Sequence, residues 1–472
     1  MIGREYEISE LRRAYESDQS EFVAVYGRRR IGKTFLINET FNGRFAFRAA
    51  GIEGEKKAVQ LDAFRAELKL QGYRACPKLK DWISAFSELE IFLEGMDAGK
   101  KVIFLDELPW FDSPCSGFLR AFEWFWNSWA SSRKDVLLII CGSATTWIID
   151  EVINSRGGLH GRVSYEIPLA AFTLRECEEF AAYRRLGFDR RQILECYMAF
   201  GGVAYYWNLL REGMSAAQNF NRLFFGVANE LRVEFDRVFA SLYRTSKLHV
   251  EIVRVLCRRK TGMTRDEVVA GVGTVSSGDV SRALKELEQC GFIRHYFMIG
   301  KSRYGGLYQL IDPYCLFYFD FIENWKGNDS EHWTRNYNAP SVNSWRGHAF
   351  ELVCLWHVAQ IKSALGISGI EADVYSWRWI SDDPVETGVQ IDMLIDRADG
   401  MVNVCEIKYS DEKYEIDRGE DERIRHRVEM FRKKSGIRKS VQSVMISANG
   451  VEDGKYKGNI LHYVTLDDLF RQ

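Results

Sequence analysis

Three apolar runs in the first third of the chain have the length of buried strands. They cover residues 21–26, 101–105 and 136–142, and glycine or carboxylate residues come at or soon after their ends. Apolar runs of roughly four to eight residues that end at turn residues are typical of strands buried on both faces of a parallel sheet. A helical pattern begins at Phe35, soon after the first run. The pattern predicts an α/β domain built on a parallel sheet.

The chain from residue 169 to about residue 244 has the spacing of amphipathic helices. Apolar residues such as Cys196, Phe200 and Leu209 recur there, and Gly201 with Gly202 interrupts them. Apolar positions on one helical face indicate helices that pack against a neighbouring domain. We expect this segment to form a helical lid.

Residues 245–315 have the order of a winged helix-turn-helix. A helix is expected at residues 248–256, a capping box at Thr264–Glu267 opens a second, and Ser276 precedes a third. Two strand patterns then flank a basic tip at residues 300–303. Three helices followed by a β-hairpin predict this fold.

The last part of the chain has a mixed pattern. An aromatic helix expected at residues 314–321 is followed by a second helix that carries Glu351. Two apolar strands are then expected at residues 388–396 and 402–408. We expect an α/β domain here as well.

Length and composition are those of a folded protein with several domains. The chain has 472 residues, of which 46% are hydrophobic and 28% are charged. A single core organises no more than about 250–300 residues, so one core is not enough. The predicted domains are residues 1–168, 169–244, 245–315 and 316–472.

Charge and cysteine content exclude several classes of protein. The formal net charge of −2 gives no overall attraction to nucleic acid, so any such contact needs a local basic surface. The 10 cysteines include no Cys-x-x-Cys pair, which argues against a zinc knuckle and against a disulfide framework. Apolar runs are too short to cross a bilayer, which takes about 20 residues. We expect a cytoplasmic protein with no membrane partner.

Residues 27–34 form a phosphate-binding pattern. The sequence Gly27-Arg-Arg-Arg-Ile-Gly32-Lys33-Thr34 fits G-x-x-x-x-G-K-[ST] and lies between an expected strand and an expected helix. In such a loop backbone N–H groups cradle phosphates, the lysine reaches the β and γ positions, and the hydroxyl binds Mg²⁺. The strand at residues 101–105 leads into Asp106 and Glu107, which we expect to serve the metal and the attacking water.

Two further residues are candidates near the phosphates. Ser143 follows the third buried run, where its hydroxyl would sense the γ-phosphate or simply end a strand. Arg162 would act as an arginine finger, or would pair on the surface with Glu166 or another acid. An arginine finger acting in trans would require a homo-oligomer.

These motifs resemble the archaeal-type ATPases of the AAA+/STAND branch of P-loop proteins. The resemblance includes Ile2-Gly-Arg-Glu5, Leu105-Asp-Glu-Leu-Pro-Trp110 and Cys141-Gly-Ser-Ala144, and it implies ATP as cofactor. Ala204 stands where the family often has proline in its lid. The nucleotide-binding residues that the motifs and the resemblance together predict are Gly3, Arg4, Gly27, Arg28, Arg29, Arg30, Ile31, Gly32, Lys33, Thr34, Phe35, Asp106 and Ser143.

A second constellation lies near the C-terminus. Glu351 on a helix, Asp392 on a strand, and Glu406 with Lys408 on the next strand follow the order of the PD-(D/E)XK nuclease superfamily, which this region resembles. Carboxylate oxygens are ligands for Mg²⁺ or Mn²⁺, and a lysine orients water and stabilises charge on the scissile phosphate. Alternatively, Glu406 and Lys408 form an exposed ion pair on a scaffold that binds without cutting.

Basic residues give candidate contacts to DNA. On the third helix and the wing of residues 245–315 these are Ser281, Arg282, Lys285, Lys301 and Arg303. The same fold also serves as a protein-protein module or as a spacer. A basic helix at residues 423–434 would line a phosphate groove or be a solvated face.

The sequence thus predicts an Mg²⁺-dependent ATPase joined through a winged helix to a metal-dependent nuclease-fold domain that acts on DNA. The main alternative is a nucleotide-gated regulator or scaffold whose nuclease-like domain binds a protein partner without cleavage. A third alternative is a DNA-binding regulator, whose binding would weaken steeply with salt.

Overall fold

The computed structural model describes residues 1–472 except 228, 244–245, 274, 301–304, 380–387 and 472. The chain forms two compact units. The first comprises residues 1–171, 203–205 and 236–247, and the second comprises residues 172–202, 206–235 and 248–472. The division into four domains stays a prediction.

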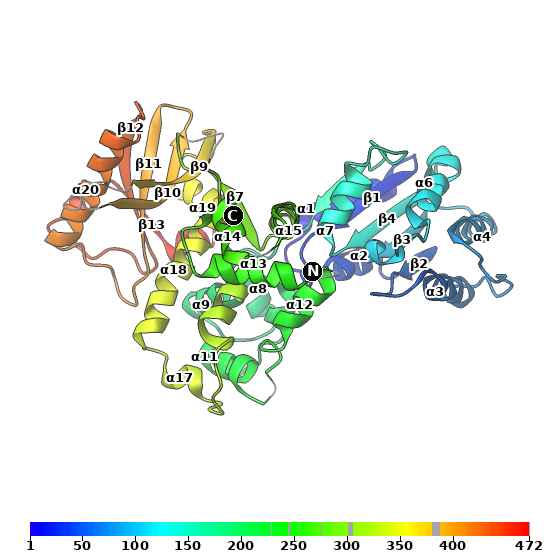
Figure 1. The fold of residues 1–472 in the computed structure, drawn as a ribbon, viewed down its shortest axis with the longest axis horizontal. Helices are drawn as coiled ribbons and strands as arrows, with labels where there is room; N and C mark the ends of the chain where they lie inside the picture. Colours follow the sequence, from blue (N-terminus) through cyan, green and yellow to red (C-terminus); the bar gives the residue numbers. More distant parts are fainter. Residues whose placement is uncertain (228, 244–245, 274, 301–304, 380–387, 472) are drawn as a thin grey trace. The chain divides into compact units, whose positions relative to one another are not determined.

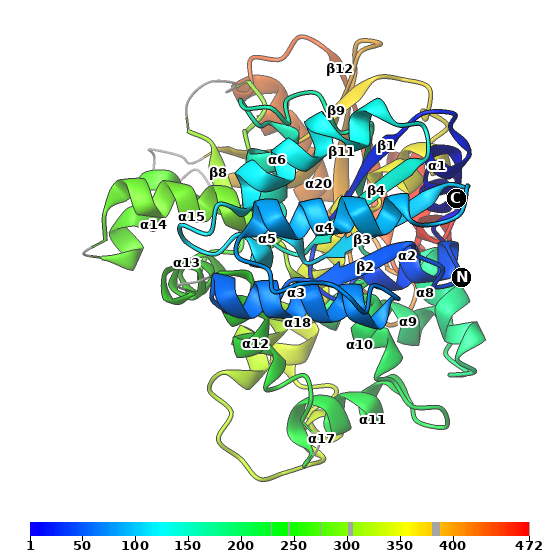
Figure 2. The ribbon, with the colours of Figure 1, turned by 90° about the vertical axis from the view of Figure 1, so that its right-hand side faces the viewer.

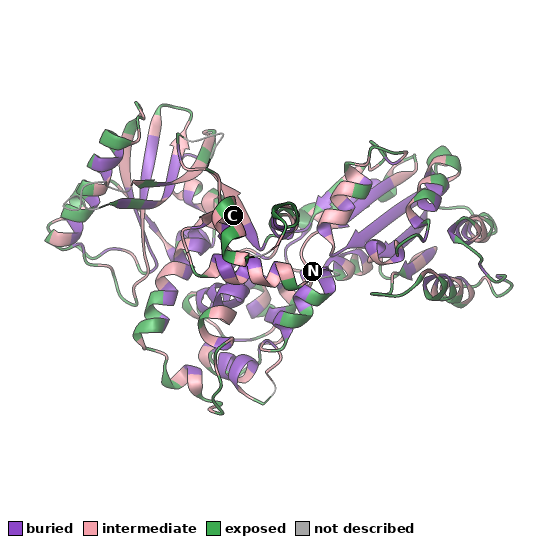
Figure 3. Cartoon of the chain, in the orientation of Figure 1, coloured by how far each residue is buried: buried purple, intermediate pink, exposed green. Residues whose placement is uncertain are grey.

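A parallel sheet of five strands forms the centre of the first unit (Figure 1). The three apolar runs become adjacent strands, β3 (Lys101–Asp106), β4 (Val136–Gly142) and β1 (Glu21–Tyr26), and every residue of β3 and β4 is buried (Figure 3). The edge strands are β2 (Phe47–Ala50) beside β3 and β5 (Tyr165–Pro168) beside β1. The predicted α/β fold with a parallel sheet is confirmed.

Helices cover both faces of this sheet. Figure 2 shows α3 (Lys57–Leu70), α4 (Trp82–Glu94) and α6 (Phe118–Ser128) on one face, where aromatic side chains fill the core. The other face packs against α1 (Glu5–Glu16) and α2 (Lys33–Thr40). Burial of each large apolar side chain contributes about 1.5–3 kcal/mol, so the sheet is a rigid base for the loops at its edge.

In the second unit, helices of the expected lid pack against the C-terminal region. Helix α9 (Arg190–Phe200) contacts α18 (Pro340–Trp356) through a buried ion pair, in which Glu195 Oε1 lies 3.2 Å from Arg346 Nη2. Helix α8 (Leu174–Tyr183) joins the same region, since Leu174 N donates to His357 Nε2 at 3.2 Å.

Residues 247–310 form three helices and a small antiparallel sheet, which we call the helix–hairpin segment. The helices are α13 (Lys247–Cys257), α14 (Arg265–Val272) and α15 (Ser277–Gln289), and the strands are β6 (Met263–Thr264), β7 (Ile293–Tyr296) and β8 (Leu307–Leu310). The expected capping box at Thr264 and Glu267 is present. Ser276 precedes α15 as expected, but its side chain accepts no capping hydrogen bond.

The aromatic helix expected at residues 314–321 is a short α-helix, α16 (Pro313–Phe317), that continues as a turn of π-helix at Tyr318–Ile322. Every residue of α16 is buried within the second unit.

A mixed sheet of five strands forms the C-terminal part of the second unit. Its order is β13 (His462–Thr465), β12 (Ser440–Ser447), β11 (Met401–Lys408), β10 (Val389–Arg397) and β9 (Ala372–Trp379). Strands β9 to β11 run antiparallel, and β12 and β13 run parallel to β11. Helix α20 (Arg418–Lys434) makes the crossover from β11 to β12. The two expected strands correspond to β10 and β11.

No helix in the described residues is both long enough and apolar enough to cross a bilayer.

Candidate functional site

The loop between β1 and α2 has the backbone shape of a phosphate cradle. Gly27 has φ +140° and Gly32, at the N-terminus of α2, has φ +98°. A Cβ at Gly27 would lie 2.4 Å from the carbonyl oxygen of Leu169, so only glycine fits there. The loop ends on a helix N-terminus, where free N–H groups and the helix dipole favour an anion.

Lys33 is buried inside this loop. Its Nζ donates to the carbonyl oxygens of Gly27 at 2.8 Å and Arg28 at 2.9 Å, and it lies 3.5 Å from Ser143 Oγ. An ammonium group that is 5% exposed needs such partners, because an isolated buried charge is costly. The predicted phosphate-binding lysine therefore lies in the loop that is expected to hold the phosphates.

Thr34 and Asp106 meet between the loop and the end of β3. Thr34 Oγ1 donates to Asp106 Oδ2 at 2.9 Å and also lies 3.2 Å from Oδ1. Burial, and then the neighbouring Glu107 carboxylate, raise the pKa of Asp106. A hydroxyl and a buried carboxylate with this excess of negative charge fit a magnesium site of the P-loop type.

Glu107 is held by the end of the neighbouring strand β4. Its Oε1 accepts from Ser143 Oγ at 2.6 Å and its Oε2 accepts from Ser143 N at 3.0 Å. Glu107 has φ +45°, an uncommon backbone conformation that is found at functional sites. The sequence predicted Ser143 near the phosphates, but it did not predict the contact with Glu107. The two residues meet because β3 and β4 are neighbours in the sheet, which the sequence does not state.

Arg30 and Tyr205 bring a short piece of the expected lid to the loop. The Arg30 guanidinium carbon lies 3.9 Å from the centre of the Tyr205 ring, and Tyr205 N donates to Arg30 O at 3.2 Å. Both residues belong to the first unit. The aromatic residue after Ala204 is therefore part of the loop's surroundings.

The other predicted nucleotide residues surround the same loop or flank it. Arg4 is buried and donates from Nη2 to Ala170 O at 2.8 Å, and Arg29 Nη1 lies 3.9 Å from Glu53 Oε2. Ile31 is buried in the core, whereas Phe35 is 59% exposed. Gly3 has φ +58°. Their contact with a nucleotide stays a prediction.

Arg162 lies on the surface of the first unit. It is exposed, and within the described residues no ion pair joins it to Glu166. Glu166 instead lies beside Tyr26, where burial and then this carboxylate raise the pKa of the phenol. The surface pairing considered from the sequence is absent from the described residues, and the arginine-finger role stays a prediction.

The residues of the predicted C-terminal constellation lie on α18, β10 and β11. Lys408 Nζ lies 2.8 Å from Glu406 Oε1, and a second cation, Arg427 on α20, places Nη1 2.5 Å from Glu406 Oε2. Lys408 also lies 3.2 Å from Oε1 of the buried Glu420. Glu420 was not predicted from the sequence, and Arg427 was predicted only as part of a basic stretch. The signal that could have pointed to both residues is the high density of charged residues in the helix that follows β11.

Asp392 occupies an irregularity in β10. The register of β10 against β9 shifts between Ile391 and Leu394, and such a bulge redirects the side chain that it contains. Asp392 Oδ1 accepts from Gln390 Nε2 at 2.6 Å. Burial raises the pKa of Asp392, and the carboxylates of Glu351 and Glu406 raise it further.

The carboxylates are neighbours but do not form a closed ligand set. Across the part of the chain that the structure describes, no three His, Cys, Asp or Glu side chains converge to hold a metal ion. Glu406 is neutralised by two cations, whereas Asp392, whose pKa is raised first by burial and then by Glu351, forms no ion pair in the described residues. Asp392 with Glu351 therefore fits a cation better than Glu406 does, and the Mg²⁺ or Mn²⁺ site stays a prediction.

The expected DNA contacts are described in part. Arg282 is exposed and lies 3.7 Å from Asp279, and Lys285 is exposed on the same helix. Ser281 donates to Ser277 O at 2.9 Å and accepts from Arg265 Nε at 2.7 Å, so it supports the helix. Lys301 and Arg303 lie outside the described residues.

Comparisons with known proteins find similarity mainly in the N-terminal part of the chain. Residues 1–210 match the model of a family described as an ATPase domain predominantly from Archaea. The uncharacterized protein MJECL04 of Methanocaldococcus jannaschii is 23% identical over 332 residues, which are 68% of this chain and 68% of that protein. The family match covers the residues that form the phosphate loop, so residues 1–210 are similar to an ATPase domain.

Solved structures similar to this chain include the following two proteins. The Walker-type ATPase PABY2304 of Pyrococcus abyssi has a TM-score of 0.48 and 16% identity, over 67% of this chain and 95% of that chain. The ORC2 protein of Aeropyrum pernix has a TM-score of 0.39 and 16% identity, over 67% of this chain and 93% of that chain.

Proposed function

We propose that the first unit binds ATP with Mg²⁺ and hydrolyses it. The observation that carries this proposal is the 2.9 Å contact between Thr34 Oγ1 and Asp106 Oδ2 beside the buried Lys33. A bound triphosphate would replace the loop carbonyls as the partner of the Lys33 ammonium. Thr34 and Asp106 would hold the magnesium ion, which neutralises charge that develops on the phosphates.

Glu107 is the proposed base for the attacking water. Its carboxylate must leave Ser143 before it can accept a proton from water, because both of its oxygens are engaged by that residue. Ser143 Oγ lies 3.5 Å from Lys33 Nζ, so a γ-phosphate bound at Lys33 competes for the same hydroxyl. Nucleotide binding would thereby weaken this contact and raise the fraction of Glu107 that is released, without abolishing the contact.

The second unit is the proposed effector. We infer that the helix–hairpin segment is a winged helix and that the C-terminal sheet is a PD-(D/E)XK nuclease fold acting on DNA. The order of α18, β10 and β11, with Glu351, Asp392, Glu406 and Lys408 on them, supports this assignment. Asp392 and Glu351 would hold the cation, and Lys408 would orient water.

The second candidate function is a nucleotide-gated regulator whose C-terminal domain binds a partner without cleavage. The ion pairs from Lys408 and Arg427 to Glu406 favour it, because they occupy a carboxylate that a nuclease would give to its metal. Contact with a second copy of the chain is proposed only through Arg162, whose exposed side chain is free to reach another subunit's phosphates.

Two substitutions separate these functions. Lys33→Ala should abolish ATP turnover under both. Asp392→Ala should abolish cleavage of DNA by the full-length protein with Mg²⁺ or Mn²⁺ only if the C-terminal domain is a nuclease. Wild-type protein that hydrolyses ATP but leaves single- and double-stranded DNA and RNA intact, with and without ATP, would establish the regulator instead.

A further inference from the structure

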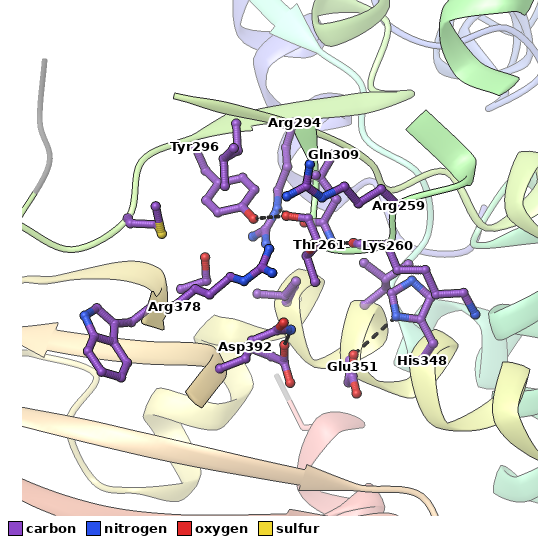
Figure 4. A pocket seen from close by; sticks show the side chains of 18 of the residues that line it. Arg259, Lys260, Thr261, Arg294, Tyr296, Gln309, His348, Glu351, Arg378 and Asp392 are labelled. Carbon is purple, nitrogen blue, oxygen red and sulfur yellow. Dashed lines mark hydrogen bonds and ion pairs between the residues drawn. The ribbon is translucent and has the colours of Figure 1, made fainter. Parts of the chain in front are cut away.

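A cavity of about 470 Å³ lies in front of Asp392 and Glu351 within the second unit (Figure 4). One wall comes from the helix–hairpin segment, and the other comes from α18, β9 and β10. Cavities of roughly 300–1,000 Å³ hold one small molecule. A cube of this volume has sides of about 8 Å, which is room for a single nucleotide but not for a base pair with both of its backbones.

Cations lie on both walls of this cavity, around the two carboxylates. Arg294, Arg378 and Lys260 line it, and Figure 4 shows the side chains of Arg294 and Arg378 pointing into the space beside Asp392. In the described residues, neither Arg378 nor Lys260 forms an ion pair. Guanidinium groups opposite carboxylates are the arrangement that a phosphate bridged to a metal ion would fill.

Arg294 is positioned before any ligand arrives. Its Nε donates to Gln309 Oε1 at 2.7 Å, and Gln309 Nε2 donates to the carbonyl oxygen of Lys260 at 2.6 Å. The guanidinium carbon lies 4.3 Å from the centre of the Tyr296 ring. These contacts engage Nε and one face of the guanidinium group, and within the described residues its two terminal nitrogens have no hydrogen-bond partner.

The hairpin limits access to the carboxylates. Ile299 N donates to Ser376 O at 3.3 Å, next to an isolated bridge between Met298 and Ser376. Ile299 is buried in the same apolar cluster as Trp377 and Ile391 of the C-terminal sheet. The end of the hairpin is thus part of the core beside the cavity, and a continuous duplex would have to displace it to reach Asp392.

We propose that this cavity binds one nucleotide of a single-stranded nucleic acid, with its phosphate between Arg294, Arg378 and the Asp392–Glu351 pair. The apolar lining from Tyr296, Trp379 and Leu355 gives the base a surface on which to pack. This inference rests on the proposed phosphodiester chemistry at Asp392 and adds its substrate class. A free nucleoside monophosphate carries the same chemistry and is the other source of such a ligand.

The test measures binding by the full-length protein with Ca²⁺ in place of Mg²⁺ or Mn²⁺, so that a cation can lie between the carboxylates and the phosphate while cleavage is suppressed. Fluorescence anisotropy would compare a labelled 5′-phosphorylated oligo-dT of about 12 nucleotides with a blunt duplex of the same length. The informative variants are Arg378→Gln and Arg294→Gln. The side chain of Arg378 is exposed, so its replacement causes no loss of packing. The matched control is Arg335→Gln on α17 (His332–Arg335), which is 69% exposed and outside the cavity.

The single strand should bind at least about tenfold more tightly than the duplex, and Arg378→Gln and Arg294→Gln should each remove about tenfold of that affinity. Arg335→Gln should bind like the wild type. Competition by free thymidine monophosphate but not by a 5′-hydroxyl oligonucleotide would identify the free nucleotide as the source. Equal or tighter binding of the duplex, or wild-type affinity in Arg378→Gln, would overturn the proposal.

This inference and the proposed nuclease function fail separately. If Asp392→Ala and the wild type are equally inactive on every nucleic acid while single-strand binding depends on Arg378, the nuclease function fails and the binding site stands. If the wild type cuts intact duplex at internal positions and Arg378→Gln cuts it equally well, the nuclease function stands and the single-strand assignment fails.

Discussion

Replacing Ser143 with alanine should raise the rate of ATP hydrolysis. The substitution removes the hydroxyl that donates to Glu107 Oε1 at 2.6 Å and leaves the backbone N–H that donates to Oε2 at 3.0 Å. A hydrogen bond to a charged group contributes about 1.5–3 kcal/mol. Since the remaining N–H keeps part of the contact, we take the lower value, which changes the population of released carboxylate about tenfold.

The assay is single-turnover hydrolysis at saturating ATP and Mg²⁺, with ATP affinity measured separately. Glu107→Gln gives the rate without the base. Ser116→Ala is the matched control, because Ser116 is as buried as Ser143, at 4% exposure, and its hydroxyl bonds Asp112 at 3.3 Å. The reasoning is refuted if the Ser143→Ala variant hydrolyses ATP more slowly than the wild type while its ATP affinity is unchanged. Ser143 would then be a required contact to the γ-phosphate.

Two predictions concern stability. Glu195→Ala should lower the free energy of unfolding by about 3–5 kcal/mol in chemical denaturation, because it leaves Arg346 charged and buried at 1% exposure. Glu179→Ala, which breaks an exposed pair on α8, should cost about 0–1 kcal/mol, and equal losses would contradict the argument. Burial, and then Glu94, raise the pKa of Glu90 to about 7. Because the folded state holds this proton more tightly than the unfolded chain, stability should fall as the pH rises from about 4.5 to about 7, and Glu90→Gln should raise the melting temperature at pH 8 but not at pH 4.

Sequence reasoning located the parts of the N-terminal site that depend on local pattern. The apolar runs at β1, β3 and β4 are continuous because those strands are buried on both faces. The loop at residues 27–34 is recognisable because Gly27 and Gly32 need positive φ. Each of these requirements acts within a few residues, so the sequence records it directly.

The missed contacts depend on elements that are distant in sequence. Glu107 meets Ser143 only because β4 lies beside β3, and Glu406 meets Arg427 only because α20 returns across the sheet. Arg294 on β7 faces Asp392 on β10 for the same kind of reason. No spacing rule links such pairs, and even Glu406 and Arg427 are 21 positions apart.

The division of the chain into interleaved segments has a mechanical consequence. The first unit takes residues 203–205 and 236–247 from stretches of sequence that otherwise belong to the second unit. The backbone therefore crosses between the two units five times, whereas a simple fusion of two domains has one linker. Ending the chain at any residue before 247 would therefore remove part of both units, and any movement of one unit would act on several backbone connections at once.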